Sequence, residues 1–169
     1  MRAYFFGNMY LSSIQQGIQA GHVIGEMVAK YSPIKTTIEE ELNNQYHMAA
    51  VRLWAQEHKT MILLNAGYGE NIRSLHKFFD SKQNPYPFAI MHEAQEALDG
   101  AATSVGIVVP EQIYIGAAQL RNGGWNDVKA IEDAGEVRWF NELDAQICVP
   151  VTIWERKLMV EMNKYGLAS

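Results

Sequence analysis

A strand that runs directly into a long glycine-bearing helix is the feature that most constrains this chain. Residues 3–10 are rich in aromatic side chains and predict a buried strand. Ser12 or Ser13 is a suitable N-cap for the helix that follows, because a serine hydroxyl can accept a hydrogen bond from a free amide of the first turn. The helix is expected to end at Tyr31, since Pro33 disfavours helical geometry in the residue before it. Strand end and helix start therefore meet at one point.

This predicted helix carries three stripes of different character, at about 100° per residue. The polar stripe holds Gln15, Gln19, His22 and Glu26. The apolar stripe, which can pack on a sheet, holds Ala20, Val23, Ile24, Met27 and Tyr31. The third stripe holds Gly17, Gly21 and Gly25. Each glycine costs the helix about 1 kcal/mol relative to Ala, so we expect another backbone or a ligand to approach that flank closely.

Size and charge narrow the class of protein. A chain of 169 residues is expected to form one domain with one core. Its net charge of -5 argues against indiscriminate binding of polyanions, so any RNA contact needs a local basic patch. Cys148 is the only cysteine, which excludes an intrachain disulfide. No signal peptide or membrane span is apparent, and we expect a soluble cytoplasmic protein that binds no membrane.

The rest of the chain alternates helices and strands. Helices are expected from about residue 37 to His58 and over 71–79, and strands over 61–64, 88–91 and 103–109. This order predicts an α/β sandwich with a largely parallel sheet and helices on both faces. In such folds the functional groups gather where strands end, and the first strand-to-helix junction is the leading candidate.

Four segments, taken in order, carry a family resemblance. Residues 17–23 read Gly-Ile-Gln-Ala-Gly-His-Val, close to an Ala-Ala-Gln-x-x-His-Ala signature that matches Gln19 and His22. Residues 54–64 resemble Trp-x-x-x-Gly-x-x-x-Ile-Val-Leu, with His58 in place of Gly. Residues 84–90 resemble a Gly-Leu-Pro-x-x-x-Ile strand entry, and residues 104–110 a fourth strand with its terminal Pro. These are features of class II peptidyl-tRNA hydrolases, which the chain resembles over residues 2–115.

The resemblance implies a fold and a division of the chain. The fold is a three-layer α/β/α sandwich around a four-stranded mixed sheet, over residues 1–115. Residues 116–169 form a C-terminal extension, expected to add a strand and a helix packed on the same domain. Residues 145–153 are strand-like, and a helical stripe follows at Trp154, Leu158, Met162 and Tyr165. We expect this stripe to face a core, and a homodimer contact is the other way to bury it.

The resemblance also implies an activity. The family cleaves the ester between a peptide and the terminal ribose of tRNA, and for this chain we expect no metal or other cofactor. By the resemblance, His22 and Glu93 provide acid/base or orienting functions, Gln19 positions the substrate, and Thr103 donates a hydrogen bond. The register is open at two points: an ungapped match puts His92 at the place of Glu93, and strict spacing puts Ala102 at the place of Thr103.

The first loop departs from the family pattern. Where the family has Gly-Lys-Gly-Lys, this chain has Ser12-Ser13-Ile14-Gln15, so that Ser13 and Gln15 take the place of groups that bind substrate. Neutral Gln15 cannot replace a cation that holds phosphate or stabilises an oxyanion. Arg73 and Lys77, on the helix predicted over 71–79, provide a basic patch that tRNA could contact instead. Either the chemistry is rebuilt around His22 and Glu93, or the chain is a non-catalytic protein that binds an RNA end, a nucleotide or a protein partner.

A zinc site is the competing interpretation of one segment. His92 and Glu96 are spaced at i and i+4, which suits a metal if the segment is helical. The second His of an H-E-x-x-H motif is missing, and no third ligand is evident. Metal-dependent hydrolysis is therefore disfavoured.

Overall fold

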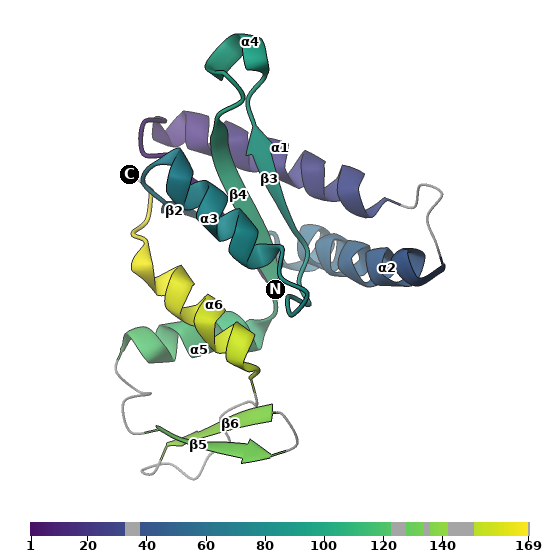
Figure 1. Cartoon of the computed structure of the whole chain (residues 1–169), viewed down its shortest axis with the longest axis vertical. Helices are drawn as coiled ribbons and strands as arrows, with labels where there is room; N and C mark the ends of the chain where they lie inside the picture. The colour runs from purple at the N-terminus through teal and green to yellow at the C-terminus, as the bar shows by residue number, and fades with distance from the viewer. Residues whose placement is uncertain (33–37, 123–127, 134–135, 142–150, 169) are drawn as a thin grey trace. The chain divides into compact units, whose positions relative to one another are not determined.

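The computed structural model describes residues 1–32, 38–122, 128–133, 136–141 and 151–168. The chain divides into two compact units (Figure 1). The first is Met1–Val109 together with Gly166–Ser169, and the second is Pro110–Tyr165.

The first unit is built on a four-stranded mixed sheet. Its strands are β1 (Arg2–Gly7), β2 (Met61–Asn65), β3 (Phe88–His92) and β4 (Ala102–Val109), in the order β2-β1-β4-β3. β1 pairs parallel with β2, whereas β4 pairs antiparallel with both β1 and β3. The predicted mixed sheet is confirmed, and the largely parallel sheet predicted from element order is wrong. Residues 93–101, which join β3 to β4, are too few for the crossover that parallel strands need.

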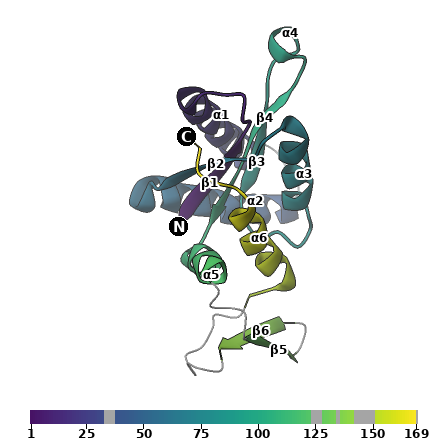
Figure 2. The ribbon, with the colours of Figure 1, turned by 90° about the vertical axis from the view of Figure 1, so that its left-hand side faces the viewer.

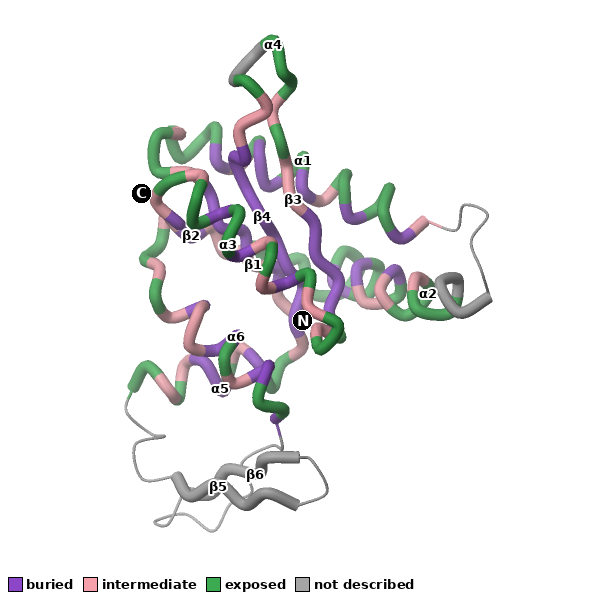
Figure 3. Tube along the Cα trace, in the orientation of Figure 1, coloured by how far each residue is buried: buried purple, intermediate pink, exposed green. Residues whose placement is uncertain are grey.

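Helices cover both faces of this sheet, which confirms the three-layer sandwich. They are α1 (Ser13–Tyr31), α2 (Ile38–Leu53) with a π-helical continuation η1 (Trp54–His58), and α3 (Gly69–Phe79). The short α4 (Gln95–Leu98) lies in the connection between β3 and β4, beyond the ends of the strands (Figure 1). Figure 2 shows α1 and α3 on opposite sides of the strands. Phe5 belongs to the core on the α1 side, and Phe6 meets Phe79 of α3 with ring centroids 5.9 Å apart. β4 is buried along all its 8 residues (Figure 3), as expected of a central strand.

The first helix begins and ends where the sequence predicts. Ser12 is the N-cap, and its side chain accepts a hydrogen bond from the backbone N–H of Gln15. At the other end, the Tyr31 hydroxyl donates to the backbone carbonyl of Phe88 and accepts from the Phe88 N–H, each at 3.1 Å. Both hydrogen bonds hold the end of α1 on strand β3.

The glycine stripe of α1 does not meet another backbone among the described residues. Added Cβ atoms on Gly17, Gly21 and Gly25 would find nothing within 4 Å among the described residues. A close approach occurs instead at Gly106 in β4, where a Cβ would lie 2.6 Å from the Phe5 ring. That glycine allows β1, β4 and α1 to pack tightly, and contact of a ligand or partner with the stripe stays a prediction.

The second unit contains α5 (Glu111–Arg121), α6 (Ile153–Lys164) and a hairpin of β5 (Val128–Asp133) and β6 (Glu136–Asn141). The two helices pack on each other, and the Asn163 side chain donates to the Ala117 carbonyl at 2.7 Å. Trp154, Leu158 and Met162 are buried and Tyr165 is half-buried, so the predicted core-facing stripe is confirmed for the first three. Burial within one chain leaves no need for a dimer contact there.

The strand expected in the C-terminal region is described by the structure only in part. Of the strand expected over 145–153, residues 145–150 lie outside the described residues, and Ile153 begins α6. Helix α5 is not expected from the sequence. After α6 the chain returns to the first unit, where Asn65 donates to the Gly166 carbonyl and Ala168 to the Leu63 carbonyl, each at 2.9 Å. None of the helices described is long and apolar enough to cross a membrane.

Candidate functional site

Four strand ends meet at one edge of the sheet. β1 and β2 are parallel, so their carboxyl ends share an edge, and β4 begins at this edge because it runs the opposite way. Asn8, just after β1, donates its backbone N–H to the Thr103 carbonyl at 3.0 Å, and Met9 donates to the Gly67 carbonyl at 2.8 Å. We call this region the sheet edge.

Three predicted site residues are joined by hydrogen bonds at the sheet edge. The Gln19 amide donates from Nε2 to Glu93 Oε1 at 2.6 Å. The Thr103 hydroxyl donates to Oε1 of the same amide at 3.3 Å. Glu93 and Thr103 are 74 and 84 positions from Gln19 in the sequence, so the fold alone brings them together.

A β-bulge accounts for the position of the Thr103 side chain. Met91 pairs with Ser104 and His92 pairs with Ala102, which leaves Thr103 as the extra residue of β4. Such a bulge changes the direction of a side chain locally. Glu93 is held in turn by its backbone N–H, which donates to the Ala101 carbonyl at 3.0 Å. Of the two open registers, the one with Glu93 and Thr103 is therefore the one whose side chains reach Gln19.

Burial helps to fix the geometry of these three hydrogen-bonded side chains. Gln19 is 9% exposed and Thr103 is 2% exposed, whereas Glu93 is half-buried and can meet a ligand. The threonine hydroxyl occupies the amide oxygen and so directs the amide N–H groups of Gln19 toward the carboxylate. Among the described residues, Gln19 is the one hydrogen-bond donor to the Glu93 side chain. The carboxylate is thus oriented and retains capacity to accept a proton from a bound water.

His22 is not part of the hydrogen-bonded group of Gln19, Glu93 and Thr103. It is one turn after Gln19 on α1 and is exposed. In the part of the chain that the structure describes, no hydrogen bond or ion pair joins its imidazole to another group. The structure therefore places His22 on the helix surface near Gln19, without a direct contact to Glu93 or Thr103.

The two predicted residues of the first loop are used by the helix start. Gln15 completes a capping box, in which its Oε1 accepts from the Ser12 backbone N–H at 2.9 Å and from the Ser12 hydroxyl at 3.0 Å. Ser13 is the first residue of α1 and is exposed. The side chain of Gln15 therefore stabilises the helix end, as a capping box does.

A cation does lie at the sheet edge, from the other face. A Cβ built on Gly69 would lie 3.2 Å from the Ala102 carbonyl oxygen, 3.8 Å from Arg73 Nη1 and 3.9 Å from Asn8 Nδ2. The Arg73 guanidinium is thus close to Ala102, which begins β4 and directly precedes Thr103. Lys77 is exposed one turn further along α3.

Two buried polar side chains beside the site are not singled out by the sequence. Gln16 is 4% exposed and Ser104 is 1% exposed, and Gln16 Oε1 and Ser104 Oγ have no hydrogen-bond partner among the described residues. Both border Gly7, which pairs with Ser104 and whose added Cβ would lie 2.8 Å from Gln16 Oε1. The signal in the sequence is slight: one serine in an apolar strand and a second glutamine next to Gln15.

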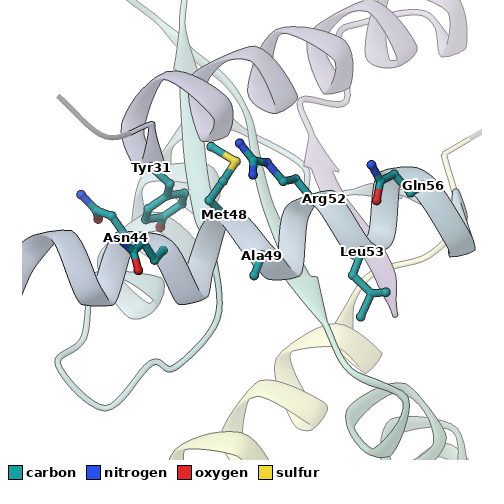
Figure 4. Close-up of a pocket in the computed structure, with 8 residues that line it drawn as sticks. Tyr31, Asn44, Met48, Ala49, Arg52, Leu53 and Gln56 are labelled. Atoms are coloured by element: carbon teal, nitrogen blue, oxygen red, sulfur yellow. The ribbon is translucent and has the colours of Figure 1, made fainter.

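A separate groove runs along α2 (Figure 4). Its volume is about 420 Å³, and it is lined by Tyr31, Asn44, Gln45, Met48, Ala49, Arg52, Leu53 and Gln56. The lining residues that the structure describes include no carboxylate and no imidazole. Burial raises the pKa of Tyr31 to about 12, so that hydroxyl stays protonated near neutral pH. The groove has space but no group suited to acid–base chemistry.

The structure does not give His92 and Glu96 the helical spacing that a zinc site would need. His92 ends strand β3 and Glu96 lies in α4, so the two residues do not share a helix. Within the described ranges, no group of three or more His, Cys, Asp or Glu side chains is placed to hold a metal ion.

Comparisons with known proteins add no relative. No family model matches the chain, and a search of curated proteins finds no significant match.

Proposed function

We propose that this chain is an esterase that cleaves the bond between a peptide and the 3′-terminal ribose of tRNA. The observation that carries the proposal is the hydrogen bonding of Glu93, Gln19 and Thr103 at an edge where β1, β2 and β3 end and β4 begins. Gln19 lies in one of the segments that resemble class II peptidyl-tRNA hydrolases, and the resemblance also implies roles for Glu93 and Thr103. Such a substrate is made by ribosomes, and we expect a cytoplasmic location.

The chemistry needs an activated water, stabilisation of a developing oxyanion and a cation for phosphate. In this proposal Glu93 accepts the proton of the attacking water, while Gln19 and Thr103 keep its carboxylate in place. His22, exposed one turn from Gln19, protonates the ribose oxygen as it leaves. Arg73 supplies from α3 the positive charge that the first loop lacks.

A turnover assay tests the proposal. Purified protein is incubated with N-acetylated aminoacyl-tRNA that carries a label on the acyl group, and release of the label is measured against buffer alone. We expect release by the native chain and a large loss in Glu93→Gln. Glu96→Gln is the matched control, because Glu96 is an exposed carboxylate three residues away. Release no faster than in buffer, by protein shown to be folded, rejects the proposal.

A binding protein without turnover is the second candidate. It is favoured by the loss of both loop lysines and by the net charge of -5. Such a protein would bind the RNA end, a nucleotide or a protein partner at the sheet edge and release no label. If Ala replacements at His22 and Glu93 abolish a measured turnover while tRNA binding is unchanged, this second candidate fails.

A further inference from the structure

Two exposed tyrosines lie side by side on the loops of the sheet edge. Tyr10 follows β1 and is 76% exposed, and Tyr68 follows β2 and is 55% exposed. Their ring centroids are 5.6 Å apart at an interplanar angle of 58°. We call these residues the tyrosine pair. The rings touch each other and still present large apolar surfaces to solvent.

The backbone beneath the tyrosine pair is held by hydrogen bonds. Met9 donates to the Gly67 carbonyl at 2.8 Å, which ties the two loops together. The Tyr10 N–H donates to Asn8 Oδ1 at 3.1 Å, and Asn71 Nδ2 donates to the Ala66 carbonyl at 2.9 Å. The loops are therefore ordered without burial of the rings. Aromatic side chains presented on a fixed loop are typical of a binding surface.

Two cationic side chains follow Tyr68 on helix α3. Arg73 and Lys77 are exposed one turn apart on α3, and Arg73 Nη1 lies close to Gly69, the neighbour of Tyr68. Among the described residues neither cation has a hydrogen bond or an ion pair. Glu70, exposed in the first turn of α3, is three residues before Arg73 on the same face of the helix and partly offsets this positive charge. Aromatic rings next to unpaired cations match single-stranded nucleic acid, whose bases stack while its phosphates seek positive charge.

We infer that the tyrosine pair stacks an unpaired nucleobase at the 3′ end of RNA, with Arg73 and Lys77 at the adjoining phosphates. This inference rests on the proposed function and specifies which side chains hold the RNA end at the sheet edge. It requires no ester in the ligand. Binding of the RNA end is thus measurable even if the chain releases no label from tRNA.

The test uses a single-stranded RNA of about six nucleotides, within the site sizes of such proteins. Its 3′ base is 2-aminopurine, whose fluorescence is quenched by stacking. We expect quenching by the native chain, and affinity reduced about 5- to 100-fold in Tyr10→Ala and in Tyr68→Ala. Tyr10→Phe keeps the ring and should bind as the native chain does. Tyr46→Ala is the matched control, because Tyr46 on α2 is also 76% exposed.

The cations are tested in the same assay. Arg73→Gln should weaken binding and reduce the slope of log affinity against log salt by about 1, whereas Arg52→Gln on α2 should not. The inference is overturned if the alanine variants at the tyrosine pair, folded by circular dichroism, bind the RNA as tightly as the native chain. It is also overturned if they lose only affinity for an N-acetylated aromatic dipeptide, because the tyrosine pair would then hold the peptide.

Discussion

The sheet edge and the α2 groove differ in what they bring together. At the sheet edge the amide of α1 is joined at 2.6 and 3.3 Å to a carboxylate and a hydroxyl from the two sides of the β3–β4 connection, more than 70 residues away in the sequence. The groove, of about 420 Å³, is lined by successive turns of α2 and η1 with Tyr31. A groove along one helix follows from the shapes of neighbouring side chains. Convergence of polar groups from distant segments requires the whole fold.

This difference teaches that space and chemistry are separate criteria for a site. Burying Gln19 and Thr103 costs free energy unless they are hydrogen-bonded, so their burial at a sheet edge calls for an explanation. The groove offers an arginine and amides that can bind a molecule, yet nothing that exchanges protons near neutral pH. Helix α1 connects the two regions, with Gln19 at one and Tyr31 at the other.

The largest expected effect is loss of turnover at the sheet edge. Glu93→Gln retains a hydrogen-bond acceptor for Gln19 but removes the base, and we expect ester release to fall about 10²- to 10⁴-fold. Arg52→Gln in the groove should leave release unchanged. Equal losses in the two variants would contradict the distinction between the two regions.

The groove should matter more to stability. Met48 lines it and is 7% exposed, so Met48→Ala removes buried apolar contacts. We expect the free energy of unfolding to fall by about 2 to 4 kcal/mol, with ester release unchanged at a temperature where the variant is folded. Urea denaturation followed by circular dichroism measures the change. A native-like midpoint would show that Met48 is not part of the core.

Tyr31 should make stability depend on alkaline pH. Its pKa is raised, chiefly by burial, from 10.0 to about 12. Between these values the unfolded chain loses the phenolic proton and the folded chain keeps it. Stability should therefore fall by about 2 kcal/mol as pH rises from 10 to 12. Tyr31→Phe should be less stable at pH 9 and lack this part of the decline, in denaturant titrations across that range. An unchanged slope in the variant argues against a buried Tyr31 hydroxyl.

The smallest expected effect lies between the two regions, on the glycine stripe of α1. Gly21→Ala adds a methyl group that meets no described residue within 4 Å, and we expect about 1 kcal/mol of added stability. Gly106→Ala is the contrasting variant. Its added Cβ would lie 2.6 Å from the Phe5 ring, so we expect this substitution to lower the stability of the fold. The midpoints of thermal unfolding of the two variants, each compared with the native chain, test both expectations. If Gly21→Ala gains stability and loses ester release, a ligand or partner contacts the stripe.

Local signals in the sequence explain how much of the fold is predictable. The serine before α1 and the proline after it mark that helix, and apolar runs mark β2 and β4. The direction of β4 depends on pairing between strands far apart in sequence, so element order alone predicts a largely parallel sheet. Helix α5 lacks a side-chain cap, and its few buried residues, Ile113 and Ala117 among them, do not stand out from a loop.

The candidate site is predictable only as a set of residue types. Gln19 is identified from its stripe and the family resemblance, but its two partners depend on a bulge at Thr103 and on the short connection after β3. Gln15 also caps α1, which is not anticipated from the sequence, and its contact with a substrate stays a prediction. Arg73 is found as a surface charge, and only the fold places it next to the start of β4.

A double-mutant cycle between Gln19 and Glu93 tests the central claim most directly. Ester release is measured for Gln19→Ala, Glu93→Gln and the double variant, with folding checked in each. If the two side chains act as one unit through their 2.6 Å hydrogen bond, the double variant should be no slower than Glu93→Gln by more than about 3-fold. Losses that multiply would show that Gln19 and Glu93 act independently, and would contradict the site described at the sheet edge.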